Sequence, residues 1–97
     1  MPKNIELGAS ILSANFCYIG EAVEESMDSN IDFIHIDIMD GRFVENITWG
    51  PRIIADIKEG FDVMTDVHLM VEKPEQVIGQ YLSAGPDRVS IHHESTY

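Results

Sequence analysis

The stretch FIHIDIMDG, residues 33–41, decides the fold of this chain. Side chains of a β-strand alternate between two faces, so this stretch has one face of isoleucines and a second face that carries His35, Asp37 and Met39. An imidazole and a carboxylate are costly to bury unless something pairs with them. Asp40-Gly41 then ends the strand with a turn. The stretch therefore predicts a strand with one face in the core and one face that carries an imidazole and a carboxylate.

Three further strand-like runs alternate with helical patterns along the chain. The runs cover residues 5–12, 64–71 and 88–94, and apolar residues spaced three or four apart indicate helices between them. Pro51 and Pro74 predict helix starts, and Gly85 predicts a helix end. The resulting order, β-α-β-α-β-α-β, is that of a parallel α/β sheet. We expect one unit over residues 1–97 without an internal boundary.

Only one face of the predicted sheet is apolar. The apolar face carries Leu7, Ala9, Ile11, Ile34, Ile36, Ile38, Val67, Leu69, Val71, Val89 and Ile91. The opposite face carries Ser10, His35, Asp37, Met39, Asp66, His68, Met70, Ser90, His92 and Glu94. An open sheet covered by helices on both sides would be apolar on both faces. The asymmetry favours a barrel wall, with helices outside and functional groups inside at the C-terminal mouth.

Composition excludes several classes of partner. The chain has 97 residues and a formal net charge of −11, which argues against a nucleic-acid surface and against binding to anionic membranes. No apolar run is long enough to cross a bilayer, and the N-terminus lacks the apolar core of a signal peptide. The single cysteine, Cys17, fits a reducing compartment. We therefore expect a cytoplasmic protein, and the composition is compatible with a small anionic substrate.

The polar face offers a candidate metal site. His35 and Asp37 lie two apart on one strand, and His68 is predicted at the matching depth on the next. Two imidazoles and a carboxylate suit Zn²⁺, Fe²⁺, Mn²⁺ or Co²⁺. The same spacing equally fits polar core groups that hydrogen-bond to one another. Asp37 can also act as a general base, whereas Asp66 is expected only to pair with neighbouring polar groups.

Other side chains flank this group on the same face. Met39 and Met70 occupy equivalent positions, where methionine serves either as a core gap-filler or as a wall that excludes water. Ser10 can bind a substrate hydroxyl or be a small barrel residue. His92 and Glu94 are expected to form a hydrogen-bonded pair at the end of the fourth strand, with an extension of the pocket rim as the alternative.

Several motifs, in order and at the right spacing, resemble the ribulose-phosphate 3-epimerase family. They are SILSA at 10–14, HIDIMDG at 35–41 followed by Phe43-Val44, NIT at 46–48 followed by Gly50-Pro51, DVHLMV at 66–71, Ala84-Gly85, and His92 with Glu94. The resemblance covers residues 5–94. It implies the first four βα units of a TIM (β/α)8 barrel, the N-terminal half, because the complete barrel has eight strands.

The resemblance also implies an activity and roles for the site. Members interconvert D-ribulose 5-phosphate and D-xylulose 5-phosphate with a divalent metal and two aspartates, which act on opposite faces of an enediolate. His35, Asp37 and His68 would be metal ligands, and Asp37 one of the two acid/base groups. Ser10 and His68 would contact the substrate, with Met39 and Met70 capping the enediolate.

The same resemblance limits what this chain is expected to do. The second aspartate, which is also the fourth metal ligand, and the phosphate loops belong to later strands, so the 97-residue chain is expected to be inactive by itself. Two exposed sheet edges predict association, for example as a homo-oligomer. One alternative is a 3-epimerase of a hexulose 6-phosphate such as allulose 6-phosphate, although SILSA favours the pentulose enzyme. Another is a non-catalytic half-barrel that binds a metal or a partner.

Overall fold

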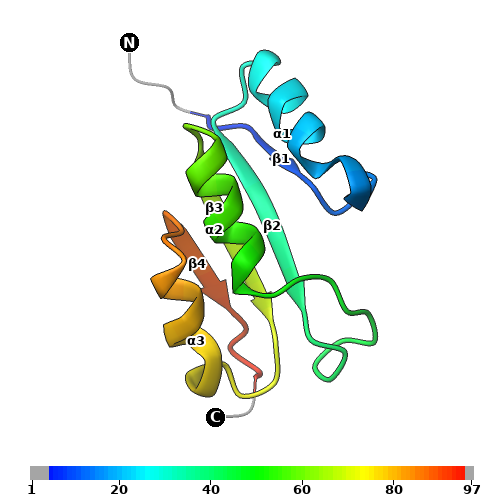
Figure 1. Cartoon of the computed structure of the whole chain (residues 1–97). Helices are drawn as coiled ribbons and strands as arrows, with labels where there is room; N and C mark the ends of the chain where they lie inside the picture. The colour runs from blue at the N-terminus through cyan, green and yellow to red at the C-terminus, as the bar shows by residue number, and fades with distance from the viewer. Residues whose placement is uncertain (1–4, 96–97) are drawn as a thin grey trace.

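The computed structural model describes residues 5–95. Its four parallel strands form one sheet in the order β1-β2-β3-β4, with bounds Gly8–Ser10, Phe33–Met39, Met64–Met70 and Arg88–Ile91. The connecting segments are a 3-10 turn η1 and helices α1, α2 and α3, with bounds Phe16–Tyr18, Ile19–Asp28, Pro51–Gly60 and Pro74–Ser83. In Figure 1, α2 lies in front of β3, and α3 is drawn below and to the left of β4. The predicted alternation of strands and helices is confirmed.

The hydrophobic core lies between the sheet and the helices. Ile34, Ile36 and Ile38 of β2 are fully buried, as the alternation of that strand predicts. They belong to one cluster with Val67, Leu69, Val23, Ile54, Ile57 and Tyr81, among others. Burial of each such side chain contributes about 1.5–3 kcal/mol relative to exposure. The other face of β2 and β3 is only partly buried, which is the asymmetry expected of a barrel wall.

The outer strands are shorter than the sequence predicts. In place of a strand over residues 5–12, the ladder covers only Gly8–Ser10. Before it, the N–H of Leu7 donates to the Asp32 carboxylate, and after it the N–H of Leu12 donates to Ser10 Oγ. The fourth strand ends at Ile91. The prediction that Leu7 and Ile91 are covered is wrong, because they are 60% and 47% exposed. Leu7 lies just before β1 and Ile91 ends β4, and each of these strands has one neighbour in the sheet.

Two prolines begin helices where the sequence predicts them. Pro51 and Pro74 occupy the first turns of α2 and α3, where a missing N–H costs no hydrogen bond. Gly85 follows α3 at φ +87°, a left-handed conformation that glycine adopts without strain. In the described part of the chain, none of the helices has the length and apolar character needed to span a bilayer.

Strand register determines which polar side chains meet. Asp37 pairs with His68, Met39 with Met70, and His35 with both Asp66 and Ser10 across its two neighbouring strands. The predicted matching depth of His68 is therefore confirmed. Because paired residues of parallel strands point to the same face, the register gathers these side chains on the face that the helices leave open.

Candidate active site

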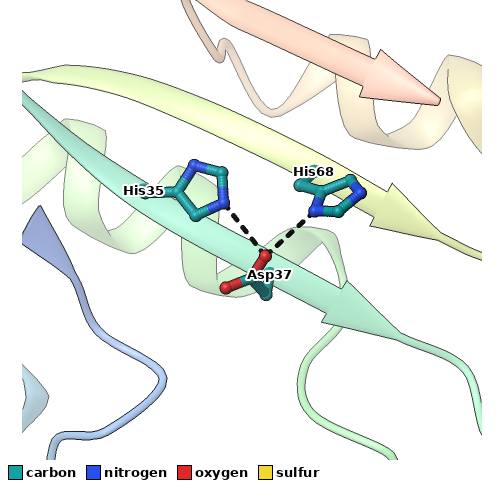
Figure 2. Close-up of side chains that lie close together, drawn as sticks. All are labelled: His35, Asp37 and His68. Atoms are coloured by element: carbon teal, nitrogen blue, oxygen red, sulfur yellow. Dashed lines mark hydrogen bonds and ion pairs between the residues drawn. The ribbon is translucent and has the colours of Figure 1, made fainter. Parts of the chain in front are cut away.

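Three side chains converge on the open face of the sheet. Figure 2 shows His35 and Asp37 on β2 and His68 on β3, with both imidazoles directed at one carboxylate oxygen. Asp37 Oδ1 lies 3.0 Å from His35 Nε2 and 3.1 Å from His68 Nδ1. All three side chains are partly exposed, so the group is reachable from solvent. The predicted grouping of these residues is thus present.

The geometry of this group fits a divalent metal ion. One donor atom from each of His35, Asp37 and His68 lies within 4.8 Å of the other two. Ligand bonds to such ions are about 2.0–2.2 Å long, so donor atoms on one ion lie about 3–4 Å apart. Two imidazoles and a carboxylate also match the donor preference of first-row metals. The same contacts would serve a mutually hydrogen-bonded group, so both interpretations of the sequence pattern agree with the distances.

Each histidine of this group has a further partner behind it. Asp66 Oδ2 lies 3.0 Å from His35 Nδ1, so the polar group with which Asp66 was expected to pair is His35, a member of the site. His92 Nε2 lies 2.7 Å from His68 Nε2, and its Nδ1 lies 2.6 Å from Glu94 Oε1. The hydrogen bond from His92 lowers the pKa of Glu94. The His92–Glu94 pair is therefore confirmed, and it also reaches the site.

Ser10 and the two methionines lie beside the group. Ser10 Oγ is 3.5 Å from Asp37 Oδ2, and it also accepts a hydrogen bond of 3.2 Å from the N–H of Leu12. Met39 and Met70 are paired in register at the C-terminal ends of β2 and β3, two residues beyond Asp37 and His68, and are partly exposed. Their placement agrees with the predicted positions, while their roles toward a substrate stay predictions.

A threonine that the sequence analysis did not select holds the end of β2. The Thr48 hydroxyl donates to the Asp37 carbonyl at 2.7 Å and accepts from the Met39 N–H at 3.0 Å. The N–H of Thr48 also donates to the Met39 carbonyl. The loop before α2 is thereby fixed to the strand that carries the candidate ligands. The only sequence signal for this role of Thr48 is its position in the NIT motif.

The carboxylate of Asp40 organises the same loop. Its Oδ1 accepts from the N–H groups of Arg42 and Phe43, and its Oδ2 accepts from the N–H of Glu72, all within 2.9 Å. Desolvation raises the pKa of Asp40, but these backbone hydrogen bonds outweigh it and lower the pKa overall. Gly41 follows at φ +73°, as the predicted turn requires. Asp40 is thus a loop-ordering residue as well as a strand terminator.

Arg88 closes the other end of the open face. Its guanidinium carbon lies 4.6 Å from the centre of the Phe33 ring, and its nitrogens lie 3.5 Å from Glu6 and 3.9 Å from Asp66. Asp66 therefore stands between a cation and the imidazole of His35.

Comparison with known proteins identifies the family of this chain. The Ribulose-phosphate 3 epimerase family matches residues 6–97. Ribulose-phosphate 3-epimerase of Synechocystis is 45% identical over 94 residues, which are 97% of this chain and 41% of that protein. The chloroplastic ribulose-5-phosphate-3-epimerase of Arabidopsis thaliana is 46% identical over 92 residues, 95% of this chain and 33% of that protein. The enzyme of Bacillus subtilis is 43% identical over 91 residues, 94% of this chain and 42% of that enzyme.

These matches cover nearly all of this chain, whereas the chain spans 41%, 33% and 42% of the three relatives. The four strands and their helices form an α/β half-barrel, in agreement with the architecture that the resemblance implies. The chain belongs to the ribulose-phosphate 3-epimerase family.

Proposed function

We propose that this chain supplies the metal-binding part of the active site of an enzyme that interconverts D-ribulose 5-phosphate and D-xylulose 5-phosphate. The observation that carries the proposal is the convergence of His35 and His68 on one oxygen of Asp37, at the C-terminal half of two neighbouring strands. Catalytic groups of (β/α)8 enzymes lie at that end of the barrel. Membership of the epimerase family supplies the reaction class.

His35, Asp37 and His68 (the trio) would hold one divalent cation, Fe²⁺, Mn²⁺, Zn²⁺ or Co²⁺. When bound, the ion would polarise the substrate ketone and stabilise the oxyanion that develops on it. Asp37 Oδ1 faces both imidazoles, whereas Asp37 Oδ2 faces the Ser10 hydroxyl at 3.5 Å. We assign Oδ2 the transfer of the C3 proton, and we assign Ser10 and His68 contacts that position the substrate.

Met39 and Met70 supply the apolar part of the proposed pocket. Both are paired at the strand ends next to Asp37 and His68, and neither side chain can donate a hydrogen bond. Above a planar enediolate they would exclude water without offering a competing proton donor. In this role the two methionines would cap the enediolate, and proton transfer would be left to the Asp37 carboxylate.

Inversion at C3 requires an acid/base group on each face of the enediolate. The trio of the described residues contains one carboxylate, Asp37. We therefore propose that the 97-residue chain by itself abstracts the C3 proton and returns a proton to the same face. Such a site exchanges the C3 proton with solvent but does not invert the centre.

Deuterium exchange tests this proposal. The chain is incubated with ribulose 5-phosphate and Mn²⁺ or Zn²⁺ in D₂O, with allulose 6-phosphate as a parallel substrate, and mass spectrometry and NMR follow deuterium at C3. The expected result is exchange above the metal-only background, lost in Asp37→Asn, with little xylulose 5-phosphate. Equal exchange in Asp37→Asn would remove Asp37 from proton transfer, and turnover like that of a complete epimerase would refute the one-carboxylate argument.

We also propose that copies of the chain associate through the sheet edges. β1 and β4 each have one neighbour in the sheet, and beside β4 lies an apolar groove lined by Pro74, Glu75, Ile78 and Ile91. Unpaired edge strands readily pair with other chains. Light scattering should detect a dimer or larger species, and a strictly monomeric chain would contradict the proposal.

Cys17 is exposed and not in a disulfide, and the cytoplasmic location stays a prediction.

A further inference from the structure

We infer that Thr48 is a positioning residue, which holds the part of β2 that carries Asp37 and Met39. The inference rests on the proposed roles of Asp37 and Met39, and it concerns a residue outside that site. Thr48 lies in the loop between β2 and α2 (Figure 1) and is partly buried. The bonds described for its hydroxyl go to main-chain atoms of β2, so its effect on the site passes through the backbone.

The neighbouring strand β1 supports only the first half of β2. Their ladder ends where Ser10 pairs with His35, and one further bond joins the N–H of Ile11 to the His35 carbonyl. Because main-chain polar groups alternate between the two edges of a strand, those of every second residue point to the same edge. The main-chain groups of Asp37 and Met39 therefore face the same edge as those of His35, but beyond the end of the β1 ladder, where they need other partners.

Thr48 supplies such partners from the loop. Its hydroxyl donates to the Asp37 carbonyl at 2.7 Å and accepts from the Met39 N–H at 3.0 Å. Its own N–H donates to the Met39 carbonyl at 3.1 Å. One residue thus takes the place that a neighbouring strand would have beside the C-terminal half of β2. The hydroxyl is donor and acceptor at once, which a valine of similar shape cannot reproduce.

Thr48 is itself held in place by the residues on either side of it. Ile47 forms an antiparallel bridge with Asp40, which directly follows β2. Trp49 packs against Phe16 of η1, with 4.5 Å between the ring centres. The loop is thus anchored to β2 and to the segment that follows β1. Because Thr48 is fixed in this way, its bonds restrict the backbone at the end of β2 and the direction in which the side chains there point.

Amide hydrogen exchange in the metal-free chain tests whether the hydroxyl holds the strand. In Thr48→Val, the Met39 amide loses its acceptor, and we expect it to exchange about tenfold faster relative to the Ile36 amide of the same strand. Thr48→Ser keeps the hydroxyl and should restore the slow exchange. Thr65→Val is the matched control, because it removes the hydroxyl of a buried threonine near the N-terminal end of β3, and it should leave this ratio unchanged. An unchanged ratio in Thr48→Val would overturn the inference, and so would equally fast exchange in Thr48→Ser.

Metal binding tests whether this positioning reaches the site. Competition with a chromophoric chelator measures the affinity for Zn²⁺ and Co²⁺, and the visible spectrum of bound Co²⁺ reports the geometry of its ligands. We expect about tenfold weaker binding and an altered Co²⁺ spectrum in Thr48→Val, with parent-like values in Thr48→Ser and Thr65→Val. Equal affinities and spectra in Thr48→Val and Thr65→Val would refute the positioning role. Absence of metal binding in the parent chain would instead refute the proposed metal site, and the exchange measurement would then decide the inference.

Discussion

Replacing Asp40 by asparagine should destabilise the fold at neutral pH by about 1–2 kcal/mol. The carboxylate accepts three backbone N–H groups, two at Oδ1 and one, from Glu72, at Oδ2. Asparagine keeps the shape and one acceptor oxygen, but its NH₂ group would face the Glu72 N–H. The lost charge-assisted bond is worth about 1.5–3 kcal/mol, and the partly exposed position reduces that figure because water can replace part of it.

The effect of this substitution should depend on pH in a defined direction. Burial raises the pKa of Asp40, but the hydrogen bonds from the backbone at Glu72, Arg42 and Phe43 lower it below the ordinary value of 3.8. A lowered pKa in the folded state means that the ionised group stabilises the fold above the unfolded pKa. That stabilisation is lost as the pH falls through the folded pKa. The difference between parent and Asp40→Asn should therefore shrink in acid.

Urea unfolding followed by circular dichroism, at pH values from neutral to about 3, measures this difference. Glu45→Gln is the matched control, because it makes the same charge change in the same loop at an exposed side chain without a described partner. The control should stay within about 0.5 kcal/mol of the parent. The reasoning is refuted if Asp40→Asn matches the control at neutral pH, or if its deficit is the same at every pH.

Two other substitutions test the core and the N-terminal end of the sheet. Ile36→Ala should lower the free energy of unfolding by about 2–5 kcal/mol, because Ile36 is fully buried, whereas Ile47→Ala, at a residue 71% exposed, should change it by less than about 0.5 kcal/mol in the same denaturation assay. Asp87→Asn should lower the melting temperature at neutral pH, because hydrogen bonds from Lys58 and the Thr65 N–H lower the pKa of Asp87. The loss should be about 1 kcal/mol above the ordinary Asp value of 3.8. It should shrink as the pH falls from that value through the lowered pKa of the folded state, and a deficit that persists unchanged in acid would contradict the ionic explanation.

Periodicity in the sequence predicted the parts of the fold that depend on local pattern. The alternation around Ile36 placed the core on one face of β2, and the same alternation placed His35 and Asp37 on the other. The starts of α2 and α3 were also predicted from their prolines, because the first turn of a helix does not need a backbone N–H at that position. The meeting of Asp37 and His68 followed once the two strands were taken as neighbours in register.

Contacts that depend on the path of a loop could not be predicted in this way. Thr48 reaches the Asp37 carbonyl only because the loop after β2 folds back beside the strand, and no period in the sequence encodes that path. The bond between Asp40 and the Glu72 N–H joins segments 32 residues apart. At both ends of the short strand β1, backbone N–H groups donate to side chains, Leu7 to Asp32 and Leu12 to Ser10, and the sequence pattern alone does not predict these acceptors.

Under the proposed function, one carboxylate must serve both a metal ion and a proton, and the surroundings of Asp37 show how the two tasks can be separated. Oδ1 lies 3.0 Å from His35 Nε2 and 3.1 Å from His68 Nδ1, while Oδ2 lies 3.5 Å from the Ser10 hydroxyl. The more weakly held Oδ2 stays available to take a proton. Under the proposed function, the two tasks would therefore divide between the oxygens of Asp37, with metal binding at Oδ1, which faces His68 of β3, and proton transfer at Oδ2, which faces Ser10 of β1.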